Sequence, residues 1–406
     1  MAERIIETFP NGLRAVAERS SGNVAYIGVL TNAGSRDDGD GRDGLAHFVE
    51  HTLFKGTASR SSWQISNRME SVGGELNAYT TKEEIMLYTN APAGYEARAV
   101  ELLADLVTTA HFPEAELDRE RGVILEEIHS YNDNAAYAVF DEFDELFFAG
   151  SGLAHNILGY ADTVKKIGSA DATDFRCRHF VPGNMVFYCV APSDPHKNMR
   201  LIERYFGNLQ GYRENSDRTK PQLNEPFDET RDRHNHQANV LLGTRIFDGH
   251  DQRRYPLILL ANYLGGPAMN SRLNRELRDK RGLVYTVETN IALYSDAGAY
   301  QLYFGCEPDN VNKCIKIFRR ELEKLASARL SDKMLNAAKR QLCGQLLVSG
   351  DSRENQAMGY AKSLMRYGEV RDNRYAARRL EEVTSEQLRD LAAMIATQPM
   401  SKLVLI

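Results

Sequence analysis

The chain has few cysteines, and their positions form no pairing pattern. Five cysteines are spread through 406 residues, and an odd number cannot all pair within one chain. They lie at Cys177, Cys189, Cys306, Cys314 and Cys343. We therefore predict buried free thiols in a reducing compartment and exclude a disulfide scaffold.

Long hydrophobic runs and an excess of positive charge are also missing. No apolar run approaches the roughly 18 residues that a membrane-spanning helix needs, and residues 1–10 lack the apolar core of a signal peptide. Lysine and arginine number 50 against 56 acidic residues, a net charge of −6. We expect a cytoplasmic protein with no membrane partner and no nucleic-acid partner.

Tryptophan is almost absent, whereas apolar residues are plentiful. The single tryptophan, Trp63, is expected to pack inside the protein. Apolar residues make up 42% of the chain, enough for two hydrophobic cores, and 406 residues exceed what one core usually spans. The composition predicts two domains.

One short motif combines the residues needed for metal-dependent hydrolysis. In His47-Phe48-Val49-Glu50-His51, the two histidines lie one turn apart on the same face of a helix, with Glu50 close to that face. Zinc hydrolases need nitrogen ligands around an open coordination position and a carboxylate that takes a proton from water. The motif supplies all of these except a third ligand.

A carboxylate helix further along the chain offers that third ligand. Glu120 and Glu127 are seven residues apart, so they lie two turns apart on nearly the same face, whereas Glu126 points about 100° away. We assign the third ligand to Glu127 and keep Glu126 as an alternative. Glu120 is predicted to orient a ligating histidine, although a solvent-exposed ion pair with a neighbouring arginine fits it as well. Histidines one turn apart are more often ordinary polar residues, so the ligand assignment depends on these carboxylates.

An internal repeat indicates two similar halves. Residues 45–51 align with Leu260-Ala261-Asn262-Tyr263-Leu264-Gly265-Gly266 at an offset of 215 residues, so the metal motif has a metal-free counterpart. Each half is expected to open with strands, continue with helices and end with a strand, an α+β architecture. We place the halves at residues 1–212 and 236–406, joined by a polar linker at residues 213–235.

Several stretches together resemble the M16 metallopeptidases, the pitrilysin or insulinase-like family. The inverted motif at residues 47–51 is typical of this group, and Gly73-Gly74-Glu75-Leu76-Asn77-Ala78 resembles its Gly-Gly-x-x-Asn-Ala stretch. Residues 277–285, which include Arg281 and Tyr285, resemble its C-terminal Arg/Tyr segment. The resemblance covers nearly the whole chain and implies two homologous α/β sandwich halves arranged as a clamshell.

The resemblance also implies a function. We expect a zinc endopeptidase that holds one Zn²⁺ per chain through His47, His51 and Glu127, with Glu50 as the base. Peptide substrates would pair with Asn77 and Ala78 as an extended strand, and Arg281 and Tyr285 would donate hydrogen bonds to a substrate carbonyl or oxyanion. Half-length members usually form dimers, so a homodimer is expected. The leading alternative is a non-catalytic scaffold or core subunit.

Overall fold

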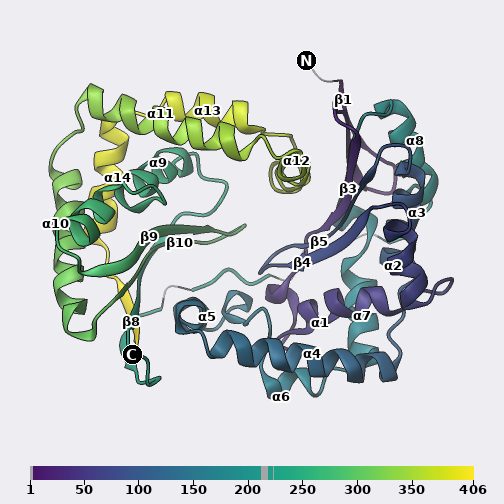
Figure 1. Ribbon diagram of the computed structural model, residues 1–406, viewed down its shortest axis with the longest axis horizontal. Helices are drawn as coiled ribbons and strands as arrows, with labels where there is room; N and C mark the ends of the chain where they lie inside the picture. Colours follow the sequence, from purple (N-terminus) through teal and green to yellow (C-terminus); the bar gives the residue numbers. More distant parts are fainter. Residues whose placement is uncertain (1–2, 212–217, 223) are drawn as a thin grey trace. The chain divides into compact units, whose positions relative to one another are not determined.

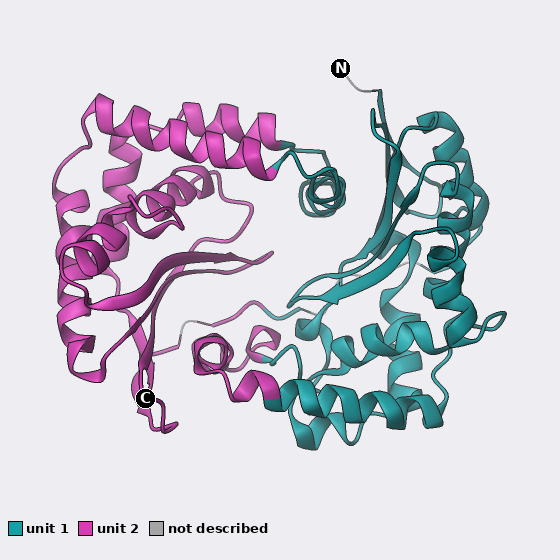
Figure 2. Cartoon of the chain, in the orientation of Figure 1, with its two compact units in different colours: residues 1–129, 155–219, 350–372 teal, residues 130–154, 220–349, 373–406 magenta. Residues whose placement is uncertain are grey.

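The structure is a computed structural model that describes residues 3–211, 218–222 and 224–406 (Figure 1). The chain forms two compact units (Figure 2). Unit 1 comprises residues 1–129, 155–219 and 350–372, and unit 2 comprises residues 130–154, 220–349 and 373–406. Residues 213–217 and 223 of the expected linker lie outside the described residues. No helix in the described part of the chain is both long and apolar enough to cross a membrane.

Unit 1 contains a six-stranded sheet with the order β1-β2-β6-β3-β5-β4. Its strands are β1 Arg4–Thr8, β2 Arg14–Arg19, β3 Val24–Thr31, β4 Glu75–Thr80, β5 Ile85–Pro92 and β6 Met185–Ala191. All neighbours are antiparallel except β2 and β6. Asn11-Gly12, a dipeptide typical of hairpin turns, lies between the paired strands β1 and β2, and Gly12 has a φ of 88°, which glycine adopts without strain. Strand β4 is an edge of the sheet.

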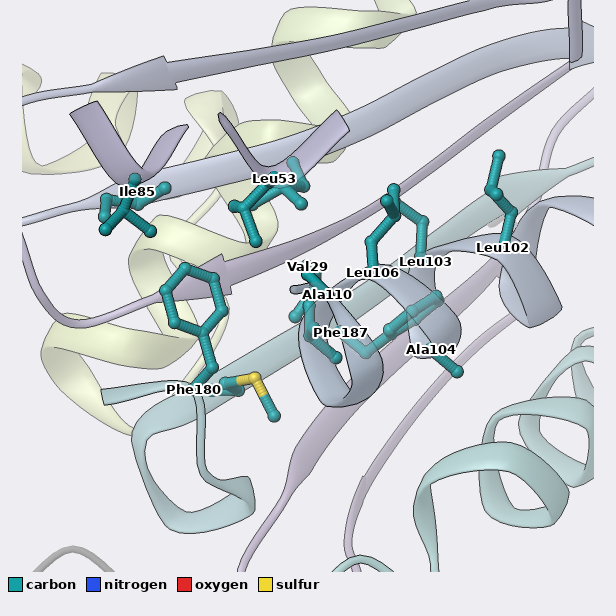
Figure 3. Close-up of a cluster of buried hydrophobic side chains, with 14 of the residues drawn as sticks. Val29, Leu53, Ile85, Leu102, Leu103, Ala104, Leu106, Ala110, Phe180 and Phe187 are labelled. Carbon is teal, nitrogen blue, oxygen red and sulfur yellow. The ribbon is translucent and has the colours of Figure 1, made fainter. Parts of the chain in front are cut away.

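Helices cover one face of this sheet. They are α1 Leu45–Thr52, α2 Ser62–Glu70, α3 Glu96–Thr109, α4 Glu114–Asn132, α6 Ala161–Val164, α7 Ser169–His179 and α8 Pro195–Phe206, with short helical turns η1 Ser35–Asp37, η2 Leu53–Lys55 and η4 Pro182–Asn184. Val29 and Phe187 of the sheet pack with Leu53 and Leu106 of the helical layer in this core (Figure 3). The metal motif therefore lies on a helix that is anchored in a large hydrophobic core.

Unit 2 repeats this plan with a five-stranded sheet in the order β7-β11-β8-β10-β9. Its strands are β7 Asp228–Arg231, β8 Ala238–Ile246, β9 Val284–Leu293, β10 Gly298–Cys306 and β11 Ser401–Leu405. Its helices are α5 Ala135–Phe147, α9 Arg254–Gly265, α10 Val311–Ser327, α11 Asp332–Ser349, α13 Asn373–Glu381 and α14 Ser385–Thr397, with the shorter η3 Gly152–Ala154, η5 Asn274–Asp279 and η6 Pro308–Asn310. The expected fold class, two similar α+β halves, is confirmed.

Each unit contains one helix from the other half of the sequence. Helix α12, Arg353–Tyr367, packs with β2, β3, β5 and β6 of unit 1, and α5 packs with β8 and β11 of unit 2. The cause is visible in β6, in which every residue is buried: a strand that is apolar on both faces needs a second cover. The compact units therefore differ from a simple division at residues 213–235.

Two smaller expectations were wrong. Trp63 is 72% exposed, because α2 buries Ile65 and Met69 instead, and these lie on another face of the helix. Not all cysteines are buried either, since Cys177 is exposed and Cys343 is partly buried. All five remain free thiols.

Candidate metal centre

Helix α1 carries the metal motif and starts at a tightly defined point. Both carboxylate oxygens of the buried Asp38 accept backbone hydrogen bonds, from Gly44 at 2.8 Å and from Ala46 at 2.7 Å. A carboxylate at a helix N-terminus pairs with the free N–H groups there. Gly44 has a φ of 92°, and a Cβ at this position would lie 2.6 Å from the carbonyl oxygen of Leu158. This position therefore requires glycine.

The structure brings His47, His51 and Glu127 together. Oε2 of Glu127 lies 3.8 Å from Nε2 of His47 and 3.6 Å from Nε2 of His51, and one ligand atom from each residue lies within 4.8 Å of the other two. These separations exceed hydrogen-bond distances. They are close to the roughly 3.4 Å between neighbouring ligand atoms around a tetrahedral zinc with bonds of about 2.1 Å. The three side chains thus fit a Zn²⁺ ion, whereas Glu126 is exposed on α4.

Burial keeps the first ligand in its metal-binding form. His47 is almost fully buried, and this burial, together with the neighbouring His51, lowers the pKa of His47 to about 3. The imidazole is therefore neutral near pH 7, as a metal ligand must be. The two imidazole rings meet edge to face, with centroids 4.5 Å apart.

Glu120 contacts His51 from the side away from Glu127. Its Oε2 lies 3.4 Å from Nδ1 of His51, and its Oε1 forms an ion pair of 2.6 Å with Nζ of Lys55. A carboxylate on the second ring nitrogen of a ligating histidine fixes the orientation and tautomer of the ring. Glu120 therefore lies where a residue that orients the His51 ring has to lie.

Glu50 lies beside the ligands and is held by strand β4. Thr80, the last residue of β4, donates a hydrogen bond of 3.0 Å to Oε2 of Glu50. Burial raises the pKa of Glu50, and Glu127 raises it further, while His51 and the Thr80 hydrogen bond act in the opposite direction. A carboxylate with a raised pKa is a stronger base.

The predicted peptide-binding residues lie on the same strand. Asn77 is exposed and Ala78 is partly buried on β4, and among the described strands β4 pairs with β5 alone. Alternation along β4 places Ala78 and Thr80 on one face of the sheet, so Ala78 faces the side that contacts α1. An unpaired strand edge therefore runs beside the metal helix.

Arg281 and Tyr285 belong to unit 2. Nη1 of Arg281 donates to the backbone oxygen and a carboxylate oxygen of Glu276, at 2.6 and 2.7 Å. Tyr285 lies on the edge strand β9 with 56% of its surface exposed, and its hydroxyl donates to Glu307 at 3.1 Å. Both side chains are donors at the surface of unit 2.

Helix α9, the counterpart of α1, has little room for larger side chains at two positions of the repeated motif. A Cβ on Gly265 would lie 2.8 Å from the side chain of Thr289, and one on Gly266 would lie 2.4 Å from that of Asn262. These are the positions that align with Glu50 and His51. Close packing thus disfavours side chains like those of Glu50 and His51 at these two positions of unit 2.

Sequence reasoning missed the residues that support this centre. Thr80 and Lys55 were not predicted, although Lys55 follows His51 by one helical turn, a spacing that indicates a shared face. The role of Asp38 at the start of α1 was harder to predict, because the run Asp37-Asp38-Gly39-Asp40 resembles an ordinary polar loop.

Comparisons with known proteins identify the family of this chain. Residues 14–160 match the family model described as insulinase (peptidase family M16), and residues 166–342 match the model of the peptidase M16 inactive domain. An uncharacterized zinc protease of Streptomyces coelicolor is 32% identical over 95% of this chain and 85% of its own length. The beta subunit of the mitochondrial-processing peptidase of Caenorhabditis elegans is 27% identical over 97% of this chain and 87% of its own length.

The fold comparison covers the complete chain. The crystal structure of a protease from Helicobacter pylori matches 100% of this chain and 99% of its own, with a TM-score of 0.90 and 20% sequence identity. This likeness establishes the fold. The two family models and the bacterial relative show that the chain belongs to the M16 peptidase family.

Proposed function

We propose that this protein is a zinc-dependent endopeptidase that hydrolyses peptide bonds in unfolded peptides or precursor segments. The observation that carries the proposal is the convergence of His47 and His51 with Glu127, whose Oε2 lies 3.8 and 3.6 Å from their Nε2 atoms. Glu50 lies between the two histidines on α1. The family membership and the zinc protease relatives support it.

The side chains divide the chemistry between them. A bound Zn²⁺ supplies Lewis acidity, which lowers the pKa of water and polarises a carbonyl. His47, His51 and Glu127 are the residues that hold it, and Glu120 orients His51. Glu50 accepts the proton of the attacking water and passes it to the leaving amine nitrogen, a role that its raised pKa favours.

The free edge of β4 is proposed to bind the substrate. An extended peptide that adds to this edge makes backbone hydrogen bonds with the strand that contains Asn77 and Ala78. Such pairing tolerates varied side chains, as expected for a peptidase with broad substrates. Arg281 and Tyr285 of unit 2 are proposed to donate hydrogen bonds to the substrate carbonyl or oxyanion.

A peptidase assay tests the proposal. The purified chain, loaded with one equivalent of zinc, is expected to cleave a quenched fluorescent peptide, to lose activity with a zinc chelator and to regain it when zinc is added back. Glu50→Gln is the matched control: it should keep zinc but lose turnover by a factor of about 10² to 10⁴, because an amide cannot accept the proton.

The alternative function predicts a different result. A non-catalytic scaffold subunit would bind zinc yet leave every peptide intact, and wild-type protein would then match Glu50→Gln. The proposed homodimer is tested separately, by sedimentation of the zinc-loaded chain at several concentrations.

A further inference from the structure

Arg218 lies in the segment that joins the two sequence halves, yet its side chain is buried in unit 1. Only 7% of the side chain is exposed. Its Nε and Nη2 donate to the two carboxylate oxygens of Asp37 at 3.0 and 2.7 Å. Its Nη1 donates to Oδ1 of Asn32 at 3.0 Å, and its Nη2 lies 3.4 Å from the backbone oxygen of Glu83. This bidentate contact with a carboxylate is a geometry that arginine provides and lysine does not.

A second buried ion pair lies against the first. Nη1 of Arg36 contacts Oε1 of Glu83 at 2.7 Å, with side chains 1% and 7% exposed, and Nη1 of Arg218 lies 3.6 Å from the same oxygen. Nη2 of Arg36 also donates to the backbone oxygen of Thr219 at 3.1 Å. Two guanidinium groups and two carboxylates thus balance one another out of contact with water. In such a group, the loss of one member leaves a buried charge without compensation.

The two acidic members belong to the two segments that support the metal helix. Asp37 immediately precedes Asp38, whose carboxylate holds the first turn of α1. Glu83 lies in the turn between β4 and β5, three residues after Thr80, which holds Glu50.

The backbone joins these segments directly. The amide of Ser35 donates to the oxygen of Thr81 at 3.1 Å, and the amide of Arg36 donates to that of Lys82 at 2.9 Å. A Cβ on Gly34 would lie 2.1 Å from the oxygen of Thr81, so the two backbone segments approach too closely for any residue except glycine. The loop before α1 and the turn after β4 are therefore one rigid support, and Arg218 bonds to both of its parts.

We propose that Arg218 is a positioning residue for the metal centre, through which the connecting segment sets the orientation of α1 and Glu50. The proposal rests on the function proposed above. Without the guanidinium, the loop that ends at Asp38 and the turn that follows Thr80 lose their shared anchor. The ligands on α1 and the base Glu50 then lose their common alignment, and displacements of this kind weaken metal binding and slow catalysis.

The test measures zinc affinity and needs no turnover. In the Glu50→Gln background, competition with a chromogenic chelator gives the zinc dissociation constant. Arg218→Ala is expected to weaken zinc binding by about 10- to 100-fold. Arg233→Ala is the matched control, because Arg233 also lies in the connecting segment and pairs with a buried glutamate, Glu142, but in unit 2. It should bind zinc as the parent protein does.

A second variant separates positioning from folding. Arg218→Met combined with Asp37→Asn removes one cation and one anion together, so the remaining pair of Arg36 and Glu83 stays balanced. Removing both members of a buried ion pair avoids the uncompensated charge that makes removal of one member strongly destabilising, and a side-chain oxygen at residue 37 can still accept the hydrogen bond from the Gly34 amide. The double variant is therefore expected to melt near the wild-type temperature but to bind zinc weakly. With Glu50 restored, it should lose kcat at saturating zinc while KM changes little.

The outcomes distinguish this inference from the proposed function. If the parent protein binds no zinc, the proposed function itself fails. If the parent binds zinc and the folded double variant binds it equally well with unchanged kcat, Arg218 has no positioning role and the inference is overturned. Should Arg218→Ala fail to fold, the double variant decides.

Discussion

His47 and Glu50 have pKa values that burial moves in useful and opposite directions. Burial disfavours charge, so it lowers the pKa of the histidine and raises that of the glutamate. The histidine is then neutral, as a ligand must be, and the glutamate is a stronger base. One physical cause thus favours the proposed roles of two different residues on the same helix.

The ligand assignment predicts how single substitutions change the zinc content. Wild-type protein is expected to hold one zinc per chain. His51→Ala should lose it and Glu127→Gln should weaken it strongly, because three ligands are needed. Glu126→Gln is the matched control on the neighbouring position of α4 and should keep zinc. Elemental analysis after dialysis decides: unchanged zinc in the first two variants contradicts the site, and loss in Glu126→Gln alone moves the ligand by one residue.

The buried ion pair of Asp37 predicts acid-sensitive stability. Burial by itself raises the pKa of Asp37, but hydrogen bonding to Arg218, the charges of Arg218 and His179, and the Gly34 amide together hold it below its usual value. Because the folded pKa is depressed, this contribution to stability is complete above the unfolded pKa of about 3.9 and is lost as the pH falls through the folded pKa.

Melting temperatures between pH 7 and pH 3 check this prediction. The wild-type Tm should fall below about pH 4, whereas Asp37→Asn should have a lower Tm at pH 7 and a flatter decline in acid. Asp232→Asn, at a 72% exposed side chain, should follow the wild-type curve. Parallel curves for wild type and Asp37→Asn would remove Asp37 from the acid response.

The exchanged helices show how repeated elements can leave their own half of the sequence. Helix α12 starts at residue 353 and α5 at residue 135, an offset of 218 residues that is close to the repeat offset of 215. They are therefore equivalent elements of the two halves. Each covers the second face of the sheet that the other half of the sequence forms.

The packing of α12 predicts a large effect of truncating Leu364. This side chain is 2% exposed among the residues of β2, β3, β5 and β6. Leu364→Ala should lower the free energy of unfolding by about 2–5 kcal/mol. Leu347→Ala, at a position 70% exposed, should change it by less than about 0.5 kcal/mol. Denaturant melts followed by circular dichroism measure both, and equal values would show that α12 contributes little to unit 1.

At the scale of the whole molecule, unit 2 is expected to contribute to catalysis without holding metal. Tyr285→Phe removes one hydroxyl donor and should lower kcat about a hundredfold at constant zinc, if the hydroxyl serves the transition state. Arg281→Ala should also impair catalysis without loss of zinc. Tyr137→Phe, at an exposed tyrosine on α5 of the same unit, is the control. Wild-type kinetics in both test variants would exclude these residues from the reaction.

Sequence patterns predicted the elements whose geometry depends on residues that are close together in the sequence. The strands that open and close each half, the helix of the metal motif and the long carboxylate helix all formed as expected. The spacing of His47 and His51 and that of Glu120 and Glu127 each lie within one helix, so helical geometry fixed which side chains share a face. The prediction for Trp63 failed because composition does not reveal which face of α2 is buried.

By itself, the sequence determined the metal helix, the carboxylate helix and the repeat, because each depends on periodicity within a short stretch of chain. Helical spacing already favoured Glu127 over Glu126. Tertiary structure alone decided that Glu127 meets the two histidines, that Thr80 holds Glu50, and that α5 and α12 each pack with the sheet of the other half of the sequence. It also decided that Arg218 is buried against Asp37. These features join residues from 30 positions apart, as for Thr80 and Glu50, to 350 positions apart, as for Arg14 of β2 and Leu364 of α12. Such contacts depend on how the elements pack and on which buried charges must balance.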